Sequence, residues 1–340
     1  MVQNQHDPDV DMSFLDGVEL CELHTHLGFS ISPTMLWELA HDQGLKLPAN
    51  NYWDFEKVVT IHESKTYEEY LKMYDLTERI QSSPQAMFIG MQSILSGAYR
   101  KNNISKLEVR GNPLLRTRDR EVDVDYIITF ALQGLEKGML KYPIKSGLIF
   151  IMDRRFDYRM NEIIVEKAIK YKDRGVIGVD LAGPIERTDT SKKFKPEDIK
   201  DLIDRAREAG LGITIHTGEA TGTDEMWEVV EYLKPTRIGH GFACYEDESL
   251  MKRLVDDGTV LELCPTSNLN TSKIKDYDEM RHVYQTIRDH GVKFTINTDG
   301  PEMQLTSLKT EYERLIVNNI FTKEDLLKAN QTAHEASFIH

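Results

Sequence analysis

The 340-residue sequence predicts an α/β fold, a (β/α)8 TIM barrel with a helical insertion after the first strand. Eight short apolar runs alternate along the chain with amphipathic segments, as expected when each parallel strand is followed by a crossover helix. The length also fits, because such barrels commonly extend past about 250 residues as one unit. We therefore predict a single barrel domain over residues 1–340.

The eight apolar runs are the predicted strands. In chain order they are Glu19–His26, Ile104–Pro113, Ser146–Asp153, Val176–Gly183, Gly212–Glu219, Arg237–Gly241, Val260–Asn268 and Phe294–Gly300. Helix-like segments separate them; Pro196–Ala209 and Glu246–Asp257, for example, end at Gly210 and Gly258, residues suited to close a helix. Eight such units favour a closed barrel over an open sheet.

The longest interval lies between the first and second strands. Residues 30–102 are predicted to form a helical cap over one mouth of the barrel, with helices at Pro33–Asp42, Thr66–Gln81 and Pro84–Arg100. Tyr67, Tyr70 and Tyr74 have helical spacing within it, which indicates a packed face and leaves open a second role as a stacking surface.

Composition excludes several classes of partner. The net charge of -14, from 42 basic and 56 acidic residues, disfavours nucleic-acid polymers and anionic membranes. Cys21, Cys244 and Cys264 form neither a disulfide framework nor a thiolate metal site. Because the sequence has no signal-peptide pattern and no apolar run long enough for a membrane span, we expect a cytoplasmic protein.

Polar side chains close four of the predicted strands, where the active site of such a barrel lies. His24 and His26 end the first strand, His216 the fifth, His240 the sixth and Asp299 the eighth. Because side chains alternate across a strand, His24 and His26 share one face and can share a metal ion. Histidines and a carboxylate without thiolate suit a hydrolytic zinc that keeps one position for water.

Each of these residues also has a structural interpretation. A histidine at a strand end is often only hydrogen-bonded, Asp299 fits a turn, and Glu219 fits the cap of the following helix. We prefer the joint interpretation, because four histidines and an aspartate at strand ends are an improbable coincidence in a chain with 11 histidines. No GxSxG turn supports a nucleophilic serine, and no glycine-rich phosphate loop is present.

Six motifs together resemble the adenosine deaminase family, the zinc aminohydrolases of adenosine, AMP or adenine within the amidohydrolase superfamily. They are ELHTHL (Glu22–Leu27), GVDLAG (Gly178–Gly183), HTGE (His216–Glu219), GHG (Gly239–Gly241), CPTSN (Cys264–Asn268) and NTDGP (Asn297–Pro301). The resemblance implies one zinc ion per chain, held by His24, His26, His216 and Asp299. A zinc ion lowers the pKa of a bound water to about 7.

The resemblance also implies the catalytic groups. Glu219 is expected to protonate a ring nitrogen, His240 to orient the water or accept its proton, and Asp299 to contact both metal and water. The backbone at Gly183 is expected to contact a purine. A binuclear site is disfavoured, because the fourth strand carries no lysine to bridge two metals. The HxE…PCxxC signature of nucleic-acid deaminases is absent.

Two positions depart from the family pattern. Gly28 and Gly300 stand where relatives acting on adenosine usually carry carboxylates that contact the sugar and the imidazole side of the purine. We therefore treat both glycines as substrate-site positions and consider Glu186 and Glu302 the candidate substitutes for the lost groups. Such a change alters which groups a site reads.

These observations predict an enzyme, a zinc-dependent hydrolytic deaminase of a purine nucleoside or a purine-like aminoheterocycle, which releases ammonia by means of a zinc-activated water. A small purine-like molecule is the expected partner. Two alternatives stay open at this point. One is a catalytically silent, purine-binding member of the family, and the other is a mononuclear amidohydrolase that acts on an amide or an ester.

Overall fold

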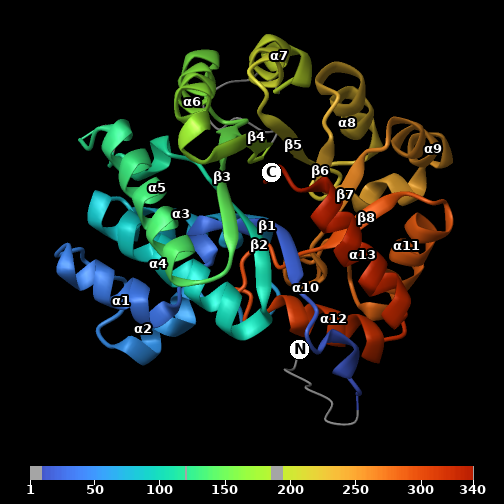
Figure 1. Cartoon of the computed structure of the whole chain (residues 1–340), viewed down its shortest axis with the longest axis horizontal. Helices are drawn as coiled ribbons and strands as arrows, with labels where there is room; N and C mark the ends of the chain where they lie inside the picture. Colours follow the sequence, from blue (N-terminus) through green and yellow to red (C-terminus); the bar gives the residue numbers. More distant parts are fainter. Residues whose placement is uncertain (1–9, 119–120, 185–193, 340) are drawn as a thin grey trace.

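Eight parallel strands follow one another in chain order around a barrel in the computed structural model (Figure 1), which confirms the predicted fold class. The structure describes residues 10–118, 121–184 and 194–339, apart from the side chains of Tyr67 and Glu68. The strands are β1 (Leu20–His26), β2 (Ile104–Gly111), β3 (Lys145–Asp153), β4 (Val176–Ala182), β5 (Gly212–Thr217), β6 (Arg237–His240), β7 (Val260–Leu263) and β8 (Lys293–Ile296).

The barrel closes through residues of the predicted site. The segment after β8 meets β1 at a parallel bridge between Thr25 and Asp299. The backbone N–H of His26 donates to the carbonyl of Asp299 at 2.7 Å, and the N–H of Asp299 donates to the carbonyl of His24 at 3.0 Å. Closure of the barrel therefore fixes Asp299 against the histidine pair.

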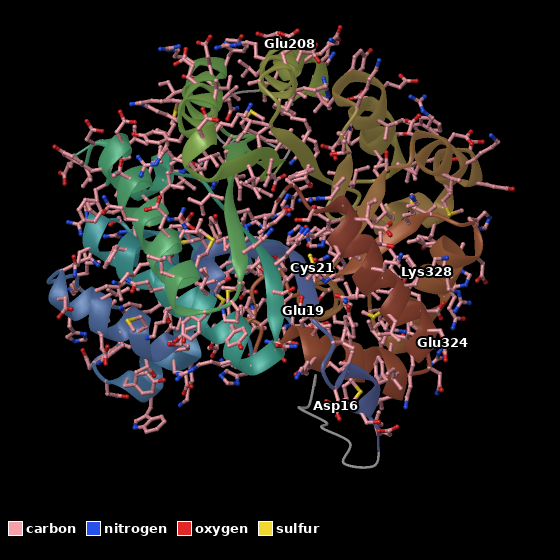
Figure 2. The ribbon with its side chains drawn as sticks, in the orientation of Figure 1. Asp16, Glu19, Cys21, Glu208, Glu324 and Lys328 are labelled. Atoms are coloured by element: carbon pink, nitrogen blue, oxygen red, sulfur yellow. The ribbon has the colours of Figure 1, made fainter. Side chains whose placement is uncertain are left out.

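An outer ring of helices surrounds the strands (Figure 1). After β1 come α1 (Pro33–Asp42), α2 (Tyr52–Val59), α3 (Tyr67–Ile80) and α4 (Pro84–Asn102), and then α5 (Val124–Lys141), α6 (Tyr158–Tyr171), α7 (Lys200–Glu208), α8 (Thr223–Glu228), α9 (Glu248–Asp257), α10 (Pro265–Asn270), α11 (Tyr277–Asp289), α12 (Leu308–Val317) and α13 (Lys323–Ala336). Charged side chains such as Glu208 and Lys328 lie on the outside of this ring, whereas Cys21 is buried at β1 (Figure 2).

The insertion differs from the prediction in two ways. Helix α2 was not predicted; Asn51 begins it by accepting a hydrogen bond from the N–H of Asp54. Helix α4 packs along α5 and β2 and buries Met91 and Leu95, as a crossover helix of the barrel does. Helices α1 to α3 pack against one another, and α3 is the one of them that contributes residues to the cavity described below.

Several strands are shorter than predicted at their carboxyl ends. β7 ends at Leu263, because Pro265 cannot donate to the ladder and instead opens α10. β8 ends at Ile296, so Asp299 lies in the loop that follows. Within the described ranges, no helix combines the length and the apolar character needed to cross a membrane. Cys21, Cys244 and Cys264 are buried and unpaired.

Candidate metal centre and active site

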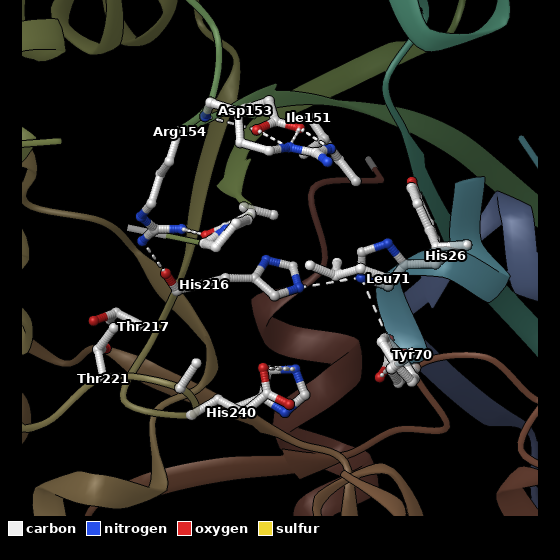
Figure 3. A pocket seen from close by; sticks show the side chains of 18 of the residues that line it. His26, Tyr70, Leu71, Ile151, Asp153, Arg154, His216, Thr217, Thr221 and His240 are labelled. Carbon is white, nitrogen blue, oxygen red and sulfur yellow. Dashed lines mark hydrogen bonds and ion pairs between the residues drawn. The ribbon is translucent and has the colours of Figure 1, made fainter. Parts of the chain in front are cut away.

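A cavity of about 510 Å³ opens at the carboxyl ends of the strands, beneath helix α3. Its volume is in the range typical of small-molecule sites. Five of the residues singled out by their place at strand ends line it: His26, His216, Glu219, His240 and Asp299. Figure 3 shows His216 and His26 facing each other across the cavity, with His240 nearby.

The four predicted metal ligands converge. The Nε2 atom of His26 lies 3.1 Å from Nε2 of His216 and 3.3 Å from Oδ1 of Asp299. Nε2 of His24 lies 3.7 Å from the same carboxylate oxygen. Ligand atoms of His24, His26 and Asp299 all lie within 4.8 Å of one another, and so do those of His24, His216 and His240. This arrangement can hold a metal ion.

Neighbouring carboxylates orient two of the rings. Nδ1 of His24 bonds to Oε2 of Glu262 at 2.8 Å, and Nδ1 of His216 bonds to Oδ1 of Asp180 at 3.0 Å. In both rings Nε2 is thereby turned toward the centre. Nε2 of His24 is buried and has no hydrogen-bond partner among the described residues. A buried, unpaired acceptor whose ring is held by a carboxylate is the usual arrangement of a metal-binding histidine.

The second oxygen of Asp299 is held separately. The Tyr70 hydroxyl donates to Oδ2 of Asp299 at 3.0 Å, and the Ser267 hydroxyl donates to the same atom. Oδ1 is therefore the oxygen left to face the histidines. Two donors on one carboxylate oxygen fix the plane of the side chain, which limits how a bound metal can move.

The protonation states suit metal binding. Burial lowers the pKa of His26 to about 3 and that of His24 well below its ordinary value, so both rings are neutral at pH 7. Burial alone would raise the pKa of Asp299, but His26, His240 and the Ser267 hydroxyl hold it below its ordinary value. Neutral imidazoles and an ionised carboxylate are the forms that coordinate a metal.

The side chain of His240 faces that of Glu219. Its Nε2 lies 3.7 Å from Oε2 of Glu219. Its Nδ1 bonds to Oδ1 of Asn268 at 2.9 Å, and the Asn268 amide in turn donates to the Tyr284 hydroxyl. Because the Asn268 oxygen can only accept, Nδ1 of His240 carries the proton in the neutral ring and Nε2 is left as a proton acceptor.

Backbone strain is concentrated in the same place. His240 and Asp299 both adopt left-handed conformations, with φ of 60° and 63°. Residues other than glycine rarely do so, and such conformations cluster at functional sites. Gly183, with φ of 90°, also lines the cavity, and a Cβ there would lie 2.7 Å from Oδ1 of Asp153. A side chain at 183 is therefore excluded by its neighbour as well as by its backbone.

Aromatic rings form the wall under the cap. Phe29 contacts Tyr70 and Tyr74, with ring centroids 5.2 Å and 4.9 Å apart, and all three rings line the cavity. The two tyrosines thus both pack and face the cavity. The side chain of Tyr67 lies outside the described residues.

Gly28 and Gly300 lie behind this wall instead of within the set of described residues that line the cavity. A Cβ at Gly28 would lie 2.5 Å from Oε1 of Glu78, and one at Gly300 would lie 2.4 Å from Cβ of Phe29. Neighbouring side chains therefore occupy the space that a side chain at position 28 or 300 would need. This differs from the expectation of direct substrate contact.

Of the two proposed substitute carboxylates, only Glu302 lies within the described residues, and it is not among those that line the cavity. Glu302 pairs with Lys101 at 2.7 Å, away from the cavity. Glu186 lies outside the described residues. Glu78 instead sits beside Gly28, buried and paired with the guanidinium of Arg116.

Sequence reasoning missed the buried charged groups beneath the site. Arg110, Asp180 and Glu262 are inaccessible to solvent. Arg110 lies between the two carboxylates and bonds to Oδ2 of Asp180 at 3.0 Å and to Oε2 of Glu262 at 2.7 Å. The available signal was a charged residue at the centre of an apolar strand, as in LEVRG, GVDLAG and VLELC.

Comparison with known proteins agrees with this geometry. A family model described as adenosine deaminase matches residues 19–340. An adenosine deaminase of Shewanella denitrificans is 29% identical over 324 residues, which is 95% of each chain. A solved amidohydrolase of Burkholderia ambifaria with bound Zn has a TM-score of 0.86 at 20% identity, covering 99% of this chain and 91% of that chain. An Arabidopsis N6-mAMP deaminase has a TM-score of 0.80 at 24% identity, covering 97% and 96%.

The two structural likenesses concern the fold, whereas the family match extends over nearly the whole chain. The resemblance first indicated by the six motifs is thereby confirmed. The chain belongs to the adenosine deaminase family of hydrolytic deaminases, enzymes that act on C–N bonds.

Proposed function

We propose that this protein is a deaminase that binds one zinc ion and removes the amino group of an uncharged, purine-like aminoheterocycle. The observation that carries the proposal is the convergence of His24, His26, His216 and Asp299 beside the cavity that Glu219 and His240 line.

The donor set suits zinc. Three imidazoles and one carboxylate, with no thiolate, form the kind of site in which zinc keeps a position for water. When bound, zinc supplies Lewis acidity that makes such a water nucleophilic near neutral pH. The Burkholderia ambifaria amidohydrolase, which shares the fold, was solved with bound Zn.

Glu219 and His240 are placed to move protons. A carboxylic acid at position 219 can protonate a ring nitrogen, so that the adjacent carbon accepts attack by water. Nε2 of His240 is the acceptor, held by Asn268, and can take the proton of the attacking water or orient it. The 3.7 Å between the two side chains lets both act on one bound ring, Glu219 on the ring nitrogen and His240 on the water that attacks the adjacent carbon.

The charged side chains that line the cavity favour an uncharged substrate. Five carboxylates line the cavity in the described structure: Asp153, Glu219, Asp224, Glu225 and Asp299. Both lining arginines are already paired, Arg154 with Glu225 at 2.8 Å and Arg155 with Asp153 at 2.7 Å. Lys273 is the third cation in the lining, so a phosphate, which the substrate of the Arabidopsis N6-mAMP deaminase carries, would have to compete with five carboxylates for three cations.

Asn112 offers one specific hydrogen bond to the substrate. Its Oδ1 accepts from the N–H groups of Leu114 and Leu115 at 2.9 and 3.3 Å, which fixes the orientation of the amide. Its Nδ2 is buried and has no partner among the described residues, and Asn112 is one of the residues that line the cavity. Because a buried unpaired donor is costly, a substrate carbonyl, ring nitrogen or hydroxyl is its natural partner.

The test is an ammonia-release screen of zinc-loaded protein with adenine, adenosine, their N6- and 5′-modified forms, and pterins. We expect release from at least one uncharged compound, slower release from 5′-phosphates, and loss of release in Glu219→Gln with zinc content unchanged. Persistent turnover in Glu219→Gln refutes the acid role.

The same screen separates the two alternative functions. Binding of adenosine or adenine without any ammonia release supports a silent purine-binding protein. Amide and ester probes are added to the panel, and their hydrolysis in place of ammonia release supports a mononuclear amidohydrolase of a different substrate class.

A further inference from the structure

The carboxyl-terminal tail, Ser337–Ile339, lies at the centre of the ring of strands. Figure 1 shows α13 leading the chain to this point within the ring of strands. The tail contacts the amino-terminal ends of β4 and β5, opposite the ends that form the cavity. Arg237 from β6 places its guanidinium 3.6 Å from the centre of the Phe338 ring.

Two glycines make room for this ring. Gly178 of β4 and Gly212 of β5 are register partners on neighbouring strands. A Cβ at Gly212 would lie 2.2 Å from Cγ of Phe338, and one at Gly178 would lie 3.1 Å from Cδ2. Real Cβ atoms do not approach a neighbour as closely as 2.2 Å and seldom as closely as 3.1 Å, so the barrel floor is shaped to receive Phe338.

The tail is also hydrogen-bonded to a buried carboxylate. The Ser337 hydroxyl and the backbone N–H of Phe338 donate to Oε1 of Glu108 at 2.9 and 2.6 Å. Arg237 donates through Nη2 to the other oxygen of Glu108 and through Nη1 to the carbonyl of Ala336 at 2.7 Å. The tail and Arg237 therefore hold Glu108 from two sides.

From Arg237 a continuous chain of bonds reaches the candidate metal ligands. Nε of Arg237 donates to Oε1 of Glu262 at 2.7 Å, and Oε2 of Glu262 bonds to Nδ1 of His24 at 2.8 Å. Through Arg110 the chain continues to Asp180, which holds His216. Its charged members, namely Glu108, Arg110, Asp180, Arg237 and Glu262, are at most 1% exposed.

We propose that the tail is a positioning element of the metal centre, which it acts on through Arg237 and Glu262. In a low-dielectric interior each charged group keeps its place only while its partners keep theirs. Loss of Ser337 and Phe338 leaves Glu108 short of two donors and frees Arg237 from its stacking partner. Arg237 then shifts toward Glu108, and Glu262 loses the bond that fixes its orientation toward His24.

The inference rests on the proposed metal site, and it differs from a simple role in stability. A tail that only closes the barrel floor changes the free energy of unfolding but leaves zinc coordination in the folded protein unchanged. A positioning tail changes both. Zinc release from the folded protein and the spectrum of a cobalt-substituted site are therefore the informative measurements.

The two test variants are Phe338→Leu and a chain that ends at Ala336. The matched control is Ile339→Ala. It alters a buried residue of the same tail whose side chain makes no bond to Glu108 or Arg237. Zinc release to a chelator is timed at a temperature where circular dichroism shows each variant folded. We expect release about tenfold or more faster in the truncated chain, and severalfold faster in Phe338→Leu, as for loss of other outer-shell partners. The control should stay within about twofold of wild type.

Cobalt substitution gives an independent readout. The visible absorption bands of the truncated chain and of Phe338→Leu are expected to shift in energy or intensity, and those of Ile339→Ala to match wild type. If the truncated chain does not fold, Phe338→Leu carries the test.

Wild-type release rates and spectra in folded tail variants overturn this inference while leaving the proposed function intact. A wild-type protein that never retains zinc or cobalt refutes the proposed function, and the inference with it.

Discussion

Replacing Glu262 by glutamine removes one negative charge from the interior of the barrel while keeping the shape of the side chain. Four donors meet this carboxylate. Nδ1 of His24 and Nη2 of Arg110 bond to Oε2 at 2.8 and 2.7 Å, and Nε of Arg237 and the Thr214 hydroxyl bond to Oε1 at 2.7 and 3.1 Å.

The magnitude follows from this arrangement. A glutamine has one acceptor oxygen, so in either orientation its NH2 group faces two donors, one of which is an arginine. Each lost bond to a charged group costs about 1.5–3 kcal/mol, so we expect a loss of about 2–5 kcal/mol in the free energy of unfolding. Because His24 also loses its anionic partner, zinc affinity should fall about 10–100-fold.

Glu78→Gln is the matched control. Glu78 is buried and paired with Arg116, yet it bonds to none of the metal-ligand residues in the described structure. Denaturant unfolding and competitive zinc titration of both variants separate the two effects. We expect both to be destabilised and only Glu262→Gln to bind zinc more weakly. Equal zinc affinity in the two variants refutes the orienting role of Glu262.

Four further outcomes are expected. Gly28→Asp should lower the free energy of unfolding by about 2 kcal/mol or more in denaturant titration, because its side chain meets the Glu78 carboxylate; an unchanged free energy of unfolding contradicts the clash. Asn112→Leu should raise KM about tenfold with little change in kcat for a substrate found in the ammonia screen, and an unchanged KM counts against a substrate hydrogen bond. Tyr70→Phe should weaken zinc binding about threefold to tenfold in titration and lower the free energy of unfolding of the metal-free protein by about 1.5–3 kcal/mol; unchanged zinc affinity contradicts the positioning of Asp299 by Tyr70. Removal of zinc by a chelator should lower the melting temperature, because a ligand present at about 1,000 times its Kd adds about 4 kcal/mol; identical melting curves contradict a bound metal.

The sequence was sufficient to predict the barrel and the convergence of the strand-end histidines. Because side chains alternate along a strand, His24 and His26 could be predicted to lie on one face. Because barrel sites form at the carboxyl ends of strands, His216 and Asp299 could be predicted to lie near them. The closing bridge between Thr25 and Asp299 shows why this works, because closure of the barrel itself sets Asp299 beside β1.

The remaining features depend on contacts between residues that are far apart in the sequence, so local sequence patterns could not predict them. Nothing local to Gly28 indicates that Glu78, on a cap helix fifty residues later in the chain, fills the space beside it. Arg110, Asp180 and Glu262 come from three separate strands, so their network exists only once the barrel is formed. The role of α4 was also misassigned, because a crossover helix and a cap helix carry similar periodicity and differ only in what they pack against.

X-ray diffraction at the zinc absorption edge, from crystals of protein purified without chelator, tests the central claim most directly. We predict one anomalous peak per chain, within coordination distance of Nε2 of His24, His26 and His216 and of Oδ1 of Asp299. A peak at another location, or no peak in crystals grown with added zinc, contradicts the account.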